Sequence, residues 1–105
     1  METHQPERRR FERFTVPTVL EIQGLPYRQR VGTTDISAAG CQVRLQHPLA
    51  PGSDVVVKVE VQGAGAARGS ARIAWESLAD RCHVGLIFDD ELTTALLPIL
   101  RKLVM

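Results

Sequence analysis

The sequence is poor in cysteine and has no long apolar run, and each shortage excludes a class of protein. Its two cysteines, Cys41 and Cys82, are too few for a disulfide framework and lack Cys-x-x-Cys spacing. Because both lie in alternating apolar segments, we expect buried, reduced thiols. No stretch approaches the roughly 20 apolar residues of a membrane span, and segment 1–14 is too polar for a secretory signal. These absences predict a cytoplasmic protein without membrane contact.

Excess charge and catalytic groups are also scarce. The chain has 13 Lys+Arg against 12 Asp+Glu, a formal charge of +1, whereas general DNA- or RNA-binding proteins carry a broad basic surface. The three histidines, His4, His47 and His83, show neither the spacing of metal ligands nor a nearby nucleophile. We therefore expect no enzyme activity, no cofactor, no metal and no nucleic-acid partner.

Alternating apolar residues dominate the middle of the chain. At 105 residues the chain has room for one domain. A period of two, which is typical of strands, marks six segments: residues 16–23, 28–34, 41–46, 54–62, 71–76 and 82–88. In the fifth segment Trp75 shares parity with Ala71 and Ile73, which predicts that its side chain is in the core.

The period changes after residue 88. Leu92, Leu96, Ile99, Leu100 and Leu103 recur at steps of three and four residues, as on an amphipathic helix. Asp89 and Asp90 supply N-cap oxygens, and Pro98 predicts a kink or two short helices. The chain is therefore predicted to be mainly β, a six-stranded antiparallel β-barrel with a C-terminal helix.

Two short patterns lie outside this regular framework. Residues 1–14 form a predicted flexible arm, with Arg8, Arg9, Arg10 and Arg13 near its end. Residues 15–105 form the predicted barrel and helix. Arginine grips phosphate oxygens or the O6 and N7 edge of guanine through two parallel hydrogen bonds.

The second pattern is Asp35-x-Ser37-x-x-Gly40, in a predicted connection between strands. A carboxylate such as Asp35 accepts from N1–H and N2–H of guanine. Ser37 either binds a phosphate or caps the turn, and Gly40 allows a close backbone approach or a positive φ. Taken alone, a terminal charge run is usually solvated, and this turn pattern usually marks a plain turn.

The two patterns together, in this order, resemble the PilZ domain family. Arg9 and Arg13 match its Arg-x-x-x-Arg motif, and Asp35, Ser37 and Gly40 match its Asp/Asn-x-Ser-x-x-Gly motif. The segment "ARIAW…CHVGLIF" resembles its closing hairpin.

The resemblance implies a non-catalytic receptor for the bacterial second messenger cyclic di-GMP on a PilZ-type barrel, with the arm closing over the ligand. In the family, an arginine at the position of Arg8 accompanies binding of a stacked ligand dimer. The implied binding residues are Arg8, Arg9, Arg13, Asp35, Ser37 and Gly40.

A receptor without a catalytic domain needs an unidentified downstream protein, which we expect to recognise the ordered arm. The alternative within the family is a ligand-independent interaction module, such as members that assist type IV pilus assembly, although these generally lack the arginine motif. A third alternative is a small RNA-binding barrel, which the 5% aromatic content disfavours. The sequence leaves open the affinity, the ligand stoichiometry and a homodimer formed through the apolar helix.

Overall fold

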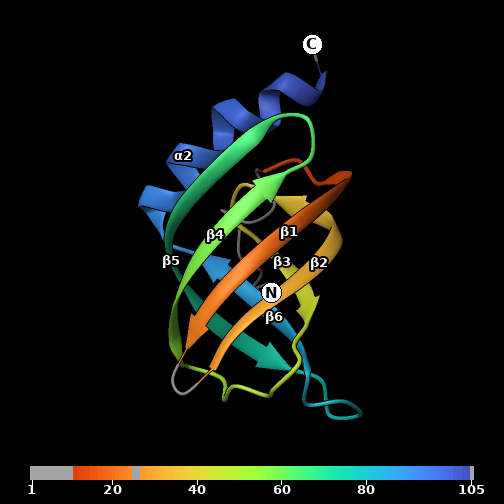
Figure 1. Cartoon of the computed structure of the whole chain (residues 1–105), viewed down its shortest axis with the longest axis vertical. Coiled ribbons are helices and arrows are strands. Elements are labelled where there is room, and N and C mark those ends of the chain that lie inside the picture. The colour runs from red at the N-terminus through yellow and green to blue at the C-terminus, as the bar shows by residue number, and fades with distance from the viewer. Residues whose placement is uncertain (1–10, 25–26, 105) are drawn as a thin grey trace, which may run out of the picture.

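Six antiparallel strands close into a barrel, and one helix packs against it, in the computed structural model of Figure 1. The structure describes residues 11–24 and 27–104. The strands are β1 (Phe14–Gly24), β2 (Tyr27–Ser37), β3 (Gly40–Arg44), β4 (Asp54–Val61), β5 (Gly65–Glu76) and β6 (His83–Phe88). Their order around the barrel is β1-β2-β3-β6-β5-β4, and β4 pairs back with β1. The predicted fold class is confirmed.

The alternation of the strands produces the core. In β4, Val55, Val57, Val59 and Val61 are all at most 3% exposed, while Lys58 and Glu60 lie on the outer face and form an ion pair. The same parity buries Leu20 and Ile22 in β1 and Val84 and Leu86 in β6. These strands therefore turn one apolar face toward the interior, while the opposite face, which in β4 also includes the 45% exposed Val56, meets solvent.

The segment between β2 and β3 is shorter than the sequence predicts. Residues 35–40 were expected as a turn, but β2 continues to Ser37 and β3 begins at Gly40. Only Ala38 and Ala39 connect them, and both are buried. This places Asp35 and Ser37 on a strand, where their directions are set by the pleat rather than by a loop.

The prediction that Trp75 is in the core is wrong. The pairing of β5 with β6 shifts register between Ile73 and Trp75, and a bulge of this kind changes the parity of the residues that follow. Trp75 pairs with Gly85, whose outward position has no side chain, so a Cβ there would overlap the indole ring. The indole therefore lies on the outer wall, covering the backbone of β6.

The C-terminal segment forms a single helix, α2 (Asp90–Arg101), followed by a 3-10 turn at Lys102–Val104. Asp89 caps it, because its Oδ1 accepts a hydrogen bond from the backbone N–H of Leu92 at 2.8 Å. Pro98 lies inside the helix, which continues past it to Arg101, so of the two predicted outcomes, a kink or two short helices, the second is wrong. The carbonyl that its missing N–H would have bonded belongs to Thr94, on the exposed side.

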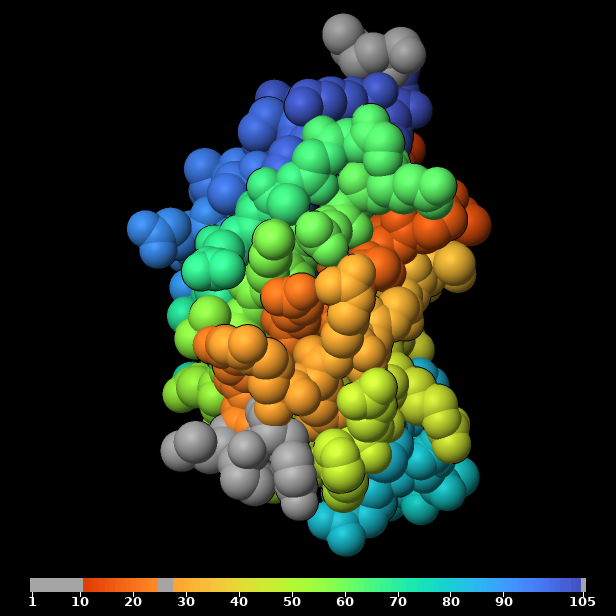
Figure 2. Space-filling view, in the orientation of Figure 1, coloured from red at the N-terminus to blue at the C-terminus, as the bar shows by residue number. Residues whose placement is uncertain are grey.

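The helix lies across β5 at one end of the barrel. Leu92, Leu96 and Leu100 are its buried residues, and a Cβ at Gly69 of β5 would come within 2.7 Å of Leu92 Cβ, so this glycine permits the close packing. In Figure 2 the helix covers one end of the molecule, and the β5–β6 connection projects at the opposite end. None of the helical segments in residues 11–24 and 27–104 has the length and apolar character to cross a membrane.

Candidate functional site

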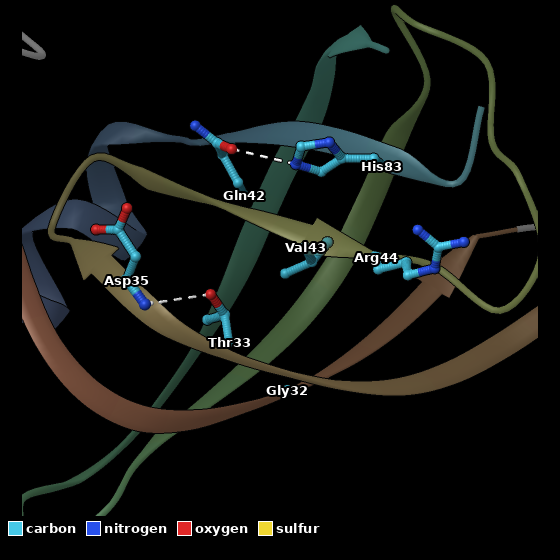
Figure 3. A pocket seen from close by; sticks show the side chains of 7 residues that line it. All are labelled: Gly32, Thr33, Asp35, Gln42, Val43, Arg44 and His83. Carbon is cyan, nitrogen blue, oxygen red and sulfur yellow. Dashed lines mark hydrogen bonds between the residues drawn. The ribbon is translucent and has the colours of Figure 1, made fainter. Parts of the chain in front are cut away.

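A pocket opens in the outer wall of the barrel where β2 and β3 separate. The register pairs these strands at only two positions, Ile36 with Cys41 and Ser37 with Gly40. Beyond the hairpin the strands diverge and leave a hollow of about 400 Å³. It is lined by Gly32, Thr33, Asp35, Gln42, Val43, Arg44 and His83 (Figure 3).

Arg13 and Asp35, one from each predicted motif, meet at the edge of this pocket. Arg13 Nε donates to Asp35 Oδ1 at 2.9 Å, and the two side chains are 46% and 53% exposed. The hydrogen bond with Asp35 raises the pKa of Arg13, so the guanidinium remains charged. Both groups keep further hydrogen-bonding capacity toward solvent, which makes them available to a ligand.

Ser37 and Gly40 shape the hairpin beside this ion pair. The Ser37 hydroxyl accepts from Ala39 N–H and donates to the Gly40 carbonyl, each at 3.2 Å. Of the two sequence interpretations of Ser37, the structure shows the turn cap. Gly40 has no positive φ; it is needed because a Cβ would overlap the carbonyl oxygen of Leu86 on β6. These two residues fix the position of Asp35.

Cys41 lies beneath the ion pair of Arg13 and Asp35, and its thiol has low reactivity. Its side chain is buried, and burial raises the pKa of its thiol to about 12. The thiol is therefore protonated at neutral pH and is a poor nucleophile. Both cysteines are free; Cys41 is buried, whereas Cys82 is partly exposed.

The far side of the pocket contains residues that the motifs do not include. His83 Nε2 lies 3.2 Å from Gln42 Oε1, and Arg44 forms an ion pair with Asp80 of the β5–β6 connection. In Figure 3 Asp35 lies toward one end of the pocket and Arg44 toward the other. Alternation predicts that Arg44 and His83 face outward, but their adjacency depends on the pairing of β3 with β6, which no local pattern reveals.

The remaining predicted arginines do not enter this description in the same way. Arg8 and Arg9 lie outside the described residues, as does Arg10. Arg72, a second outward arginine, instead pairs with Asp54 through Nε and Oδ1 at 3.2 Å. Within the described part of the chain, no three His, Cys, Asp or Glu residues are grouped so that they could hold a metal ion.

A second hollow of about 140 Å³ lies behind the hairpin. Phe11 and Phe14 from the arm and the start of β1, Ala38 from the hairpin, and Leu97 and Leu100 from α2 line it, with Glu12 and Arg101 at its rim. The phenylalanines also pack against the core. The base of the arm, the hairpin and the helix therefore share one apolar contact region.

Comparison with known proteins gives a consistent result. The family model described as the PilZ domain matches residues 7–105. Among solved structures, the PilZ domain of YcgR from Escherichia coli with c-di-GMP superposes with a TM-score of 0.65, at 18% sequence identity and over 90% of each chain. At this identity the structural likeness shows the shared fold. No curated protein sequence matches the chain.

Proposed function

The chain belongs to the PilZ domain family, and from this we propose that it is a non-catalytic receptor for cyclic di-GMP. The observation that carries the proposal is the pairing of Arg13 with Asp35 at the edge of an open, polar pocket. The two motifs are separated by 22 residues in sequence between these positions, yet their side chains are in direct contact. The structure of E. coli YcgR with c-di-GMP, which shares the fold, supports the choice of ligand.

The chemistry of the pocket suits a guanine nucleotide with phosphates. Asp35 accepts from the N1–H and N2–H edge of a guanine, and Arg13 and Arg9 donate to phosphate oxygens or to O6 and N7. Ser37 and Gly40 hold the hairpin that positions Asp35. We assign Arg8 to a second, stacked ligand molecule, as the family resemblance implies.

The expected affinity follows from the number of charged contacts. Each charge-assisted hydrogen bond contributes about 1.5–3 kcal/mol, and ordering the arm costs about 2–5 kcal/mol. Four or five such contacts, less that cost, span about −1 to −13 kcal/mol, a range that includes the value of about −8 kcal/mol for micromolar binding.

In this proposal the receptor passes on the signal through a contact with a downstream protein. Closing the arm over the ligand changes the position of Phe11, which touches the same hollow as Ala38 of the hairpin and Leu97 of α2. The base of the arm and the helix thus line one hollow together with the hairpin that carries Asp35. We propose that ligand binding presents a reshaped arm–helix surface, and that the partner recognises this surface.

Calorimetric titration with cyclic di-GMP tests the proposal. We expect saturable micromolar binding by the wild-type chain, no comparable heat from GTP, and at least a hundredfold loss in Arg13→Ala. Arg72→Ala is the matched control, because Arg72 forms a similar exposed ion pair outside the pocket. No binding by folded wild-type protein would contradict the proposal and favour the ligand-independent interaction module. A ratio of two ligands per chain would support the role of Arg8.

A further inference from the structure

Gln42 and His83 form a polar pair on the pocket wall, outside both motifs. Gln42 lies on the outer face of β3 opposite Gly85 of β6, and His83 lies opposite Arg44. The contact between their side chains is drawn as a dashed line between Gln42 and His83 in Figure 3. Both residues line the same hollow as Asp35, so a molecule held by Asp35 also faces this pair.

The imidazole of His83 is held in place from several sides. It meets the indole of Trp75 edge-on, with ring centroids 5.4 Å apart and an interplanar angle of 82°. The backbone of His83 is held as well, because its N–H donates to the Asp80 carbonyl and its carbonyl accepts from Ser77 N–H, each at 2.9 Å. The indole contact and the Gln42 contact orient the ring on this fixed backbone, which suits a ligand-recognition group.

The pair can act as a donor or as an acceptor, depending on the proton of His83. When Nε2 carries a hydrogen it donates to Gln42 Oε1, and the amide N–H groups of Gln42 remain for the pocket. When Nε2 lacks a hydrogen, it accepts from the Gln42 amide, which then turns its oxygen toward the pocket. A protonated imidazole allows only the first arrangement.

The charges around His83 favour an anion once the ring is protonated. The charged groups around it are Arg44 on β3, Asp80 and Arg81 in the β5–β6 connection, Glu76 at the end of β5 and, across the pocket, Asp35 on β2. Each acid has a basic partner: Arg44 pairs with Asp80, Arg81 with Glu76 and Arg13 with Asp35. A proton on His83 therefore leaves this region with one net positive charge.

We propose that Gln42 and His83 are ligand-binding residues that donate to acceptor atoms of cyclic di-GMP, the guanine O6 and N7 edge or a phosphate oxygen, and that protonation of His83 tightens binding. This inference rests on the proposed function. Asp35 is complementary to the donor edge of guanine, so the pair on the opposite wall supplies the donors that Asp35 lacks. The receptor then responds to acidification as well as to ligand concentration.

The test is calorimetry with cyclic di-GMP at about pH 8 and about pH 5.5. We expect wild-type binding to be about three- to tenfold tighter at the lower pH. His83→Gln should lose this pH response, and His47→Gln, which alters a histidine outside the pocket lining, should keep it. Gln42→Glu retains an acceptor for His83 but has no N–H donor, and we expect about tenfold weaker binding at both pH values.

The outcomes separate the two proposals. Wild-type binding without a pH response, or an unchanged response in His83→Gln, would overturn the role of the pair and leave the receptor function standing. No binding by the folded wild-type chain at either pH would overturn both. Equal thermal stability of the variants, measured by circular dichroism, confirms that affinity and not folding has changed.

Discussion

Gly40→Ala separates the packing role of the second motif from its proposed ligand contacts. A Cβ at Gly40 would overlap the carbonyl oxygen of Leu86 and lie 3.2 Å from Leu86 C and 3.4 Å from the Cα of Ile87. All three are backbone atoms, so no side chain can rotate away, and β3 must move from β6. The ladder at this point includes the hydrogen bond from Phe88 N–H to the Ala39 carbonyl at 2.8 Å.

The cost can be worked from these contacts. Overpacking of this kind costs about 1–3 kcal/mol, and a weakened hydrogen bond adds about 1 kcal/mol. We expect Gly40→Ala to lower the free energy of unfolding by about 2–4 kcal/mol, which leaves a domain of ordinary stability folded at low temperature. Because the hairpin carries Asp35, the variant should also bind cyclic di-GMP more weakly while it is folded.

Gly32→Ala is the matched control. Gly32 lines the same pocket on β2, but a Cβ there would meet nothing closer than the Thr18 carbonyl oxygen at 3.7 Å. We expect the control to stay within about 0.5 kcal/mol of the wild type, since alanine fits without strain. Urea unfolding followed by circular dichroism measures both variants. Equal stabilities would refute the close approach of β3 to β6 as the reason for this glycine.

Three further predictions concern stability. Burial raises the pKa of Cys41 from 9.0 to about 12. The stability that the protonated thiol gives the folded state is therefore present below pH 9.0, and it is lost as the pH rises toward the pKa of the folded state. Between about pH 8 and about pH 10 the wild type should lose about 1.4 kcal/mol more than Cys41→Ala in urea titrations, and equal losses would contradict the assigned burial effect. Asp89→Ala removes the helix cap and should cost about 1 kcal/mol in thermal unfolding, whereas Asp90→Ala, in the same turn but not the cap, should cost clearly less. Gln29→Leu removes three hydrogen bonds that a buried side chain makes to the backbone of Gln46 and His47, so we expect a loss above about 2 kcal/mol and faster proteolysis of the β3–β4 connection; an unchanged cleavage rate would contradict this role.

The sequence predicts the elements of this fold well because strand and helix periods are local. Every second residue of β4 from Val55 to Val61 is a buried valine, and Asp89 stands where a helix cap is needed. Period alone misplaces Trp75, because a single bulge in β5 reverses the parity. At Pro98 the predicted alternative of two short helices is wrong, because one helix runs through this exposed proline.

The candidate site is predictable only in part, because it depends on contacts between distant segments. Arg13 and Asp35 were singled out as parts of two short patterns, which together resemble the family motifs, and the structure brings them together. Gln42 and His83 are 41 residues apart and belong to no motif. Their proximity follows from the strand order that places β6 beside β3. Outward polar residues on any strand look alike until that order is known.

Strands β2 and β3 pair at only two positions, so the barrel wall has few inter-strand pairs at the proposed binding site. A weakly paired seam opens more often than the rest of a sheet, so its amide protons should exchange early. A ligand that bridges β2 and β3 holds the two strands together reversibly. By mass action it stabilises the folded chain by about 2.7 kcal/mol at a concentration of 100 times Kd. The amount of the receptor in a cell would then rise with its own messenger, because the free form is the one that proteases reach first.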